Sequence, residues 1–307
     1  MAGIRLRGRG SRGVTLIEML VVISILVALL GIGVPLMAPA MEGRRIREAA
    51  RQVHVYFGSA RNHAVATSQP VGVMIHRFDG LPECAMTLDQ VESPPPYNGD
   101  TLSSRAQVQW TGGTQITATL SDFNPSLVST GDLAQFGHQG PYYTITSVGT
   151  GGITADLYNP QVQFFPWTGT PSAPVEYTIY RRPTKSMTSP LQLPTGAVID
   201  LQFSGQGSES FGSGSGAVYI MFSPHGAIDR VYSDTINRRV IRPIHLLIGK
   251  REKIPTAAGD ENWRDFHNIW VSLNPQSGLV TTSEVASAES LDESRALAVD
   301  AAGNGGY

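Results

Sequence analysis

A single carboxylate, Glu18, lies at the head of a long apolar segment. Residues 19–41, which follow it, carry no charge. A charged side chain at the centre of a bilayer costs about 2.5–3.5 kcal/mol or more, so such a residue is by default a functional one. Glu18 therefore needs a cationic partner at the same depth. A free α-amino group, created by cutting the chain after Gly13, would supply that partner.

The remaining polar residues form no catalytic or metal-binding pattern. The histidines are scattered, and the sequence has no H-E-x-x-H, no G-x-S-x-G turn, no G-x-x-x-x-G-K-[ST] loop and no D-x-[DN]-x-[DN]-G loop. Asp260, Glu261 and Asp265 lie close in sequence, but carboxylates in loops are usually solvated. The only cysteine, Cys84, is interpreted as a structural thiol. We therefore expect no enzyme activity, no cofactor and no metal site.

An apolar helix has to position Glu18. Residues 19–41 are long enough to cross a hydrocarbon core of about 30 Å as a helix. Four arginines, at positions 5, 7, 9 and 12, precede this segment, so the N-terminus should stay in the cytoplasm and the rest should be translocated. A secretory signal cut near residues 37–40 and a plain signal anchor are the alternatives. Neither of them accounts for Glu18.

Residues 12–20, RGVTLIEML, resemble the prepilin cleavage and methylation motif of type IV pilins and type II secretion pseudopilins. The resemblance implies that a prepilin peptidase cuts between Gly13 and Val14, removes the basic leader (residues 1–13) and N-methylates Val14. It also implies that Glu18 pairs with the Val14 amine of a neighbouring subunit and sets the axial register of a filament. The first residue after the cut is usually Phe or Met, whereas this sequence has Val14. The difference is expected to affect N-methylation more than cleavage.

The same helix is expected to continue beyond the membrane and to cover residues 14–69. From residue 42 onward, apolar residues such as Ile46, Val53 and Phe57 recur at the spacing of an amphipathic helix, and arginines cover the other face. Pro35 is predicted to kink the apolar half. By resemblance, this spine is pilin architecture, with one half in the membrane and the other packed on a sheet.

Alternating patterns after residue 70 predict an antiparallel β head, and so an α+β fold. Strands are expected at 71–78, 197–203, 217–222, 243–249 and 268–273, with the segment from Pro82 to Pro96 as loop. Reverse turns are expected at 223–226 and 274–278. Residues 193–203, 220–230 and 270–280 resemble the head of the GspH-type minor pseudopilins. The head is predicted to comprise residues 70–96 and 183–283.

The middle of the chain does not fit a compact pseudopilin head. Residues 97–182 are predicted to form an inserted small β domain, a barrel or a sandwich. Its strands are expected at 115–120, 142–148, 153–157, 162–165 and 175–180. The Gly- and Ser-rich residues 204–216 are interpreted as a flexible connection, and residues 284–307 as a flexible acidic tail, either a frayed helix or a disordered segment.

These features predict a structural minor pseudopilin of a type II secretion-like system. It would be anchored in the inner membrane with its head in the periplasm, and its partners would be prepilin peptidase, other pseudopilin or pilin subunits and the secretion machinery. A minor pilin of a type IV pilus or DNA-uptake filament is the alternative, and the motif search disfavours a membrane-anchored enzyme. Nucleic acid is not expected as a partner, because loss of the four leader arginines lowers the formal net charge of −2 by four, to −6.

Overall fold

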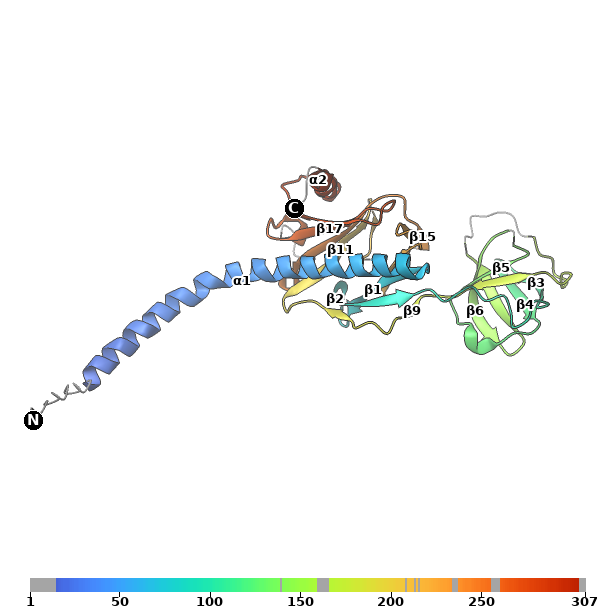
Figure 1. Ribbon diagram of the computed structural model, residues 1–307, viewed down its shortest axis with the longest axis horizontal. Coiled ribbons are helices and arrows are strands. Elements are labelled where there is room, and N and C mark those ends of the chain that lie inside the picture. The colour runs from blue at the N-terminus through green and yellow to red at the C-terminus, as the bar shows by residue number, and fades with distance from the viewer. Residues whose placement is uncertain are drawn as a thin grey trace, which may run out of the picture.

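The computed structural model describes residues 15–138, 140–158, 166–207, 209–212, 214, 216–233, 237–254 and 260–303, without the side chains of residues 31–40, 237–239 and 302–303. The fold is α+β and its sheets are antiparallel, which confirms the predicted class. The first helix, α1 (Leu16–Thr67), packs on a 12-stranded sheet. A six-stranded sheet lies at the end of the molecule away from the N-terminus (Figure 1).

The second half of α1 buries one apolar face against the large sheet. Ile46, Val53 and Phe57 are at most 1% exposed, and alanines 49, 50, 60 and 64 are buried beside them. These residues recur every three or four positions, so they share one side of the helix. The helix ends at Ser68, whose φ of 53° is left-handed, two residues before Pro70. The sequence pattern thus dictates which side of the helix meets the sheet.

The large sheet has the strand order β15-β14-β13-β1-β2-β11-β16-β17-β18, with short strands paired to β2 and β11. Its strands are β1 (Val71–Phe78), β2 (Leu81–Glu92), β9 (Thr184–Lys185), β10 (Leu191–Gln192), β11 (Ala197–Gln206), β12 (Glu209–Ser210), β13 (Val218–Phe222), β14 (Ile228–Tyr232), β15 (Asn237–Arg239), β16 (Ile244–Lys250), β17 (Ile269–Leu273) and β18 (Val280–Glu284). The segment expected as loop from Pro82 is therefore mostly strand β2. Its backbone pairs with β1, and this long-range pairing outweighs the local effect of one proline.

The two turns predicted in the head meet at the second half of α1. Ser223 accepts the backbone N–H of Gly226, and Asn274 accepts that of Gly278. Arg61 of α1 donates through Nε to the carbonyl oxygens of Gly226 (3.2 Å) and Ser277 (3.0 Å). A side chain at Gly278, whose φ is +63°, would collide with the carbonyl oxygen of Gly226. The turns therefore tie the sheet to the spine.

In its described part, the predicted flexible tail contains a packed helix rather than a frayed or disordered one. Residues 291–303 form the helix α2 (Leu291–Gly303), which packs on the sheet face that α1 leaves uncovered. Because alternate strand residues point to opposite faces, Leu246 packs toward α1 whereas Leu247 and Trp270 pack toward α2. The Trp270 indole N–H donates to Ser294 at 3.1 Å. The sequence did not predict this packed helix because the apolar residues of α2 are interspersed with small and acidic ones.

The connection at 204–216 also differs from its prediction. β11 continues into it as far as Gln206, and β12 pairs back onto β11. The Phe211 side chain is 1% exposed and belongs to the core under α1. Among the described residues of this stretch, one aromatic side chain therefore holds a Gly- and Ser-rich segment to the head.

The second sheet has the order β3-β4-β7-β6-β5-β8 and its own core. Its strands are β3 (Ala106–Gly112), β4 (Gln115–Leu120), β5 (Leu133–Phe136), β6 (Tyr143–Gly149), β7 (Gly152–Leu157) and β8 (Tyr177–Tyr180). Backbone hydrogen bonds join Ala106 of β3 to Val175, just before β8, in both directions (2.7 and 2.9 Å). The sheet therefore closes on itself as a small barrel. The expected strand at 162–165 lies outside the described residues.

Two chain segments connect the barrel to the head, residues 93–96 on the way out and 181–183 on the way back. They leave neighbouring strands, since Glu92 of β2 pairs with Thr184 of β9. The buried carboxylate of Asp89 holds this junction, because it contacts Lys185 Nζ at 2.8 Å and His76 Nε2 at 2.7 Å. The described part of the chain also contains three short 3-10 helices, η1 (Pro125–Leu127), η2 (Arg251–Lys253) and η3 (Asn262–Arg264).

Replacement of Phe57 tests how α1 holds the head. Phe57 is fully buried and its ring lies edge-on to Phe222 at 6.4 Å between centroids. We expect Phe57→Ala to lower the free energy of unfolding by about 3–5 kcal/mol, because the lost contacts leave a cavity. Val55→Ala, at a helix position that is 56% exposed, should change it by less than about 0.5 kcal/mol. Urea unfolding measures both, and equal losses would contradict the packing described.

The domain limits 97–182 remain a prediction that deletion can test. Removal of these residues, with a short Gly/Ser linker between positions 96 and 183, should leave a folded head, because the cut ends lie next to paired strands. We expect cooperative unfolding and an intact near-ultraviolet signal from the head tryptophans Trp263 and Trp270. Loss of that signal in the shortened chain would mean that the barrel is part of the head core.

Candidate functional site

The start of α1 places Glu18 in a capping box. Thr15 is the N-cap, and its hydroxyl oxygen accepts the backbone N–H of Glu18 at 3.3 Å. In return, Glu18 Oε2 accepts the Thr15 backbone N–H at 3.2 Å. Such reciprocal bonds satisfy two of the donors that a helix N-terminus leaves unpaired. The carboxylate therefore has a defined place at the tip of the helix, on the side of its positive dipole end.

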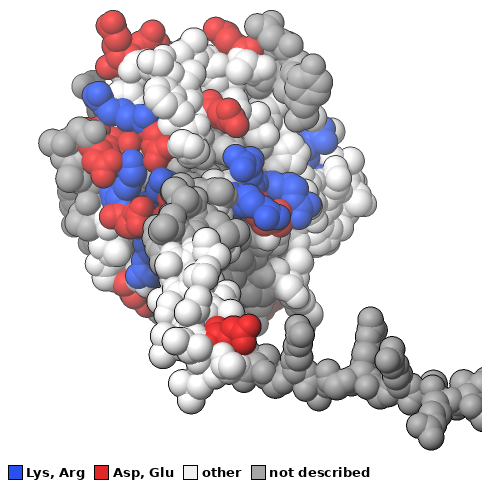
Figure 2. All heavy atoms as spheres, turned by 90° about the vertical axis from the view of Figure 1, so that its left-hand side faces the viewer, with Lys and Arg blue, Asp and Glu red and all other residues white. Residues whose placement is uncertain are grey.

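The helix around Glu18 is apolar on every side. Large side chains from Leu16 to Leu30 are exposed, with Leu16 at 84% and Val21 at 49%. Figure 2 shows this part of α1 as a surface that is almost entirely free of Lys, Arg, Asp and Glu. Residues 15–30 contain no charge other than that of Glu18. A helix that is apolar all round needs an apolar environment, such as lipid or other helices. Apart from hydroxyl groups, the Glu18 carboxylate is the only polar side-chain group that lipid or a neighbouring helix would contact there.

The predicted site residues differ in how far the structure describes them. Gly13 and Val14 lie outside the described residues, so cleavage, methylation and pairing of Val14 with Glu18 stay predictions. Pro35 lies within α1, but its side chain is outside the described set, and its predicted kink stays untested as well. Cys84 is buried beside Val198 and Ile254, and burial raises the pKa of its thiol.

A charged cluster holds α1 where it leaves the head. Glu42, the first charged residue after the apolar segment, contacts Lys250 Nζ at 3.2 Å. Lys250 also contacts Asp265 at 3.3 Å, and Asp265 contacts Lys253 Nζ at 3.3 Å. The Asp265 side chain is only 12% exposed. This cluster fixes the direction of the emerging helix relative to the sheet.

The environment of Asp265 shifts its titration. Partial burial alone would raise its pKa, but the backbone N–H of His267 and the ammonium groups of Lys250 and Lys253 outweigh burial and lower the pKa to about 2. The prediction that Asp260, Glu261 and Asp265 are solvated loop carboxylates agrees with Asp260, which is 65% exposed. It is wrong for Glu261 and Asp265, whose side chains are 19% and 12% exposed. The alternation of lysines and acids over residues 250–265 could have indicated a charged cluster. The sequence did not show that Glu42 belongs to it, because Glu42 is distant along the chain.

Within the described residues, no helix is long and apolar enough to cross a membrane. The predicted span, residues 19–41, includes residues 31–40, whose side chains are not described. In the same described part of the chain, no three His, Cys, Asp or Glu side chains gather as a metal site would require.

Comparison with known proteins identifies the N-terminal segment. Residues 8–34 match the family described as the prokaryotic N-terminal methylation motif. This range includes Gly13, Val14 and Glu18. Neither the curated proteins nor the solved structures gave a match. The motif indicates a type IV pilin-like protein that is processed by a prepilin peptidase and assembles with other pilin-type subunits.

The cluster at Glu42 predicts a pH-dependent loss of stability. A carboxyl whose folded pKa lies below its unfolded value stabilises the fold above the unfolded pKa, near 4, and loses that contribution as the pH falls toward the folded pKa, about 2. Asp265→Asn should therefore cost about 2 kcal/mol at pH 7 and almost nothing at pH 2.

Urea unfolding at pH 7, 4 and 2 checks this dependence. Asp260→Asn is the matched control, because Asp260 is 65% exposed and its one ion pair among the described residues is with Lys253. Its loss should stay below about 1 kcal/mol, as for other exposed ion pairs. A loss for Asp265→Asn that is the same at pH 7 and pH 2 would show that its charge does not contribute.

Proposed function

We propose that this chain is a structural minor pseudopilin of a type II secretion-like system, of the GspH-type subgroup. The observation that carries the proposal is Glu18, a lone carboxylate at the head of an exposed apolar helix, inside a methylation motif. The packing of the second half of α1 on an antiparallel sheet supports it, since the resemblance implies that arrangement. The chain would act by assembly rather than by catalysis.

In this proposal, cleavage after Gly13 creates the partner of Glu18. The new α-amino group of Val14 stays cationic after one methylation. In an apolar filament core, where the dielectric is low, its attraction to a carboxylate is far stronger than in water. An unpaired charge there is costly, so a subunit enters the filament at the axial position that brings Glu18 to the amine of its neighbour. The pair thereby sets the register.

The membrane holds the subunit before assembly. Residues 19–41 number 23, which at 1.5 Å per residue gives a helix of about 35 Å, enough for a hydrocarbon core of about 30 Å. The leader arginines keep the N-terminus on the cytoplasmic side of the inner membrane and place the head in the periplasm. The barrel then lies at the end farther from the membrane (Figure 1). It is available there to the secretion machinery.

A minor pilin of a type IV pilus or a DNA-uptake filament is the second candidate, favoured by the same motif, which does not distinguish the two kinds of filament. Deletion of the chain in its host separates them. A pseudopilin deletion should leave substrates of the secretion system inside the cell. Normal secretion together with lost pili or lost DNA uptake would select the alternative.

Replacement of Glu18 tests the proposed pairing. Glu18→Val should be cleaved normally but should enter filaments about tenfold less or worse, because about 1.4 kcal/mol is a factor of ten and an unpaired amine in hydrocarbon costs more. Cross-linking to a neighbouring subunit, with the leader monitored on a gel, measures both steps. Glu48→Val, which removes an α1 carboxylate outside the apolar half, is the control. Unchanged incorporation of Glu18→Val would refute the pairing.

A further inference from the structure

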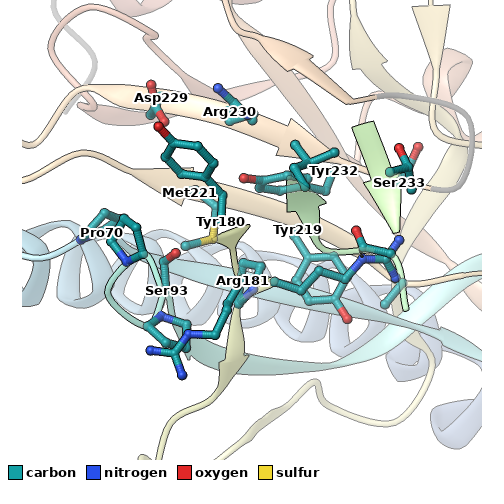
Figure 3. Close-up of a pocket in the computed structure, with 18 of the residues that line it drawn as sticks. Pro70, Ser93, Tyr180, Arg181, Tyr219, Met221, Asp229, Arg230, Tyr232 and Ser233 are labelled. Atoms are coloured by element: carbon teal, nitrogen blue, oxygen red, sulfur yellow. Dashed lines mark hydrogen bonds between the residues drawn. The ribbon is translucent and has the colours of Figure 1, made fainter. Parts of the chain in front are cut away.

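A cavity of about 880 Å³ lies where the barrel meets the head. One wall comes from β13 and β14 of the head, and the other from β5, β6 and β8 of the barrel. The two connecting segments, with Ser93 and Arg181, form its floor (Figure 3). Ligand sites often occur at domain junctions, and this volume lies within their usual range of about 300–1,000 Å³. No part of the assembly site described above lines it.

The lining is positively charged. Its described lining residues include three arginines, at positions 181, 182 and 230, and one carboxylate, Asp229. Arg181 donates to the Pro95 carbonyl at 2.8 Å, and Arg182 Nε to the Gly131 carbonyl at 2.9 Å. Carbonyl oxygens orient a guanidinium but do not neutralise it. Among the described ion pairs, none includes these three arginines, so the cavity attracts anions.

Aromatic rings and hydroxyl groups form the rest of the lining. Tyr180 of the barrel and Tyr219, Met221 and Tyr232 of the head lie around the cavity (Figure 3). Tyr158 of the barrel also lines it. Burial raises the pKa of Tyr158, Tyr180 and Tyr232, so their hydroxyl groups stay protonated at neutral pH. Flat rings offer stacking faces, and hydroxyl groups both donate and accept hydrogen bonds. Both features suit a ligand built of hydroxylated rings.

The lining strands argue against an extended peptide. β13 already pairs with β1 and β14, and β14 pairs with β13 and β15. On the barrel side, β5 pairs with β6 and β8, and β6 with β5 and β7. A peptide that binds by strand addition needs an unpaired strand edge for its main chain. β8 pairs with β5 on one side and is bridged through Ile179 to Tyr97 on the other. The described strands of the lining therefore offer no open edge, so recognition falls to side chains.

We propose that this cavity binds an acidic saccharide, a short run of uronic-acid residues whose carboxylates meet the arginines and whose rings stack on the tyrosines. Guanidinium groups bind carboxylates through paired hydrogen bonds, and the tyrosine hydroxyls match sugar hydroxyls. The site is independent of filament assembly. It gives the barrel and the head a shared ligand that neither could bind alone.

Isothermal titration of the full-length chain in detergent tests the proposal, with tetragalacturonate as the probe. Its fully methyl-esterified form measures the need for charge, and tetraglutamate measures the need for sugar rings. We expect tetragalacturonate to bind at least tenfold more tightly than either control. No binding of tetragalacturonate would overturn the site, and equal binding of tetraglutamate would overturn the saccharide class.

Variants place the binding in the cavity. Arg230→Gln should weaken tetragalacturonate about tenfold, the usual loss for one charge-assisted hydrogen bond. Tyr232→Phe, which keeps the ring, should weaken it several-fold and serves as a second variant if Arg230→Gln is misfolded by circular dichroism. Arg264→Gln removes an exposed guanidinium next to Trp263, outside the cavity, and should bind as the wild type does. Wild-type affinity in both cavity variants would overturn the assignment.

Discussion

The charge of Glu18 in an apolar helix is the constraint on which the rest of the molecule depends. A carboxylate in hydrocarbon must find a cation or remain near water. Here it bonds to the first turn of its own helix, where the capping box and the helix dipole stabilise it. In the proposed filament, the Val14 amine of a neighbour takes over that role. An apolar helix thereby becomes an element that recognises one axial position.

A pairing of this kind can set the position of a whole subunit only if the helix is rigidly joined to its head. Three features of α1 provide that join. Phe57 and the alanine face pack into the sheet core, Arg61 holds two turns, and Glu42 enters a cluster of lysines and acids at the exit. Apolar burial supplies most of the energy, and the polar contacts fix the angle.

The sequence predicted those parts of the fold that depend on local periodicity. The second half of α1, the strand at 115–120 and the two glycine turns follow from spacing and from positive φ. The prediction failed where long-range contacts decide. β2 forms despite Pro82 because β1 pairs with it, and Phe211 and α2 pack into clusters whose other members are mostly distant in sequence. Glu18 was identifiable because its charge is anomalous in its surroundings, whereas the partners of Asp265 come together only in the fold.

The N-terminus of the chain taken from its host membrane tests the central claim most directly. Peptide mass spectrometry should find Val14 as the first residue, with one methyl group on its amine and no peptide from residues 1–13. That result would place a cation beside the start of α1, as the charge of Glu18 requires. A mature chain that begins at residue 1 or 2, or after the apolar segment near residue 40, would contradict the account.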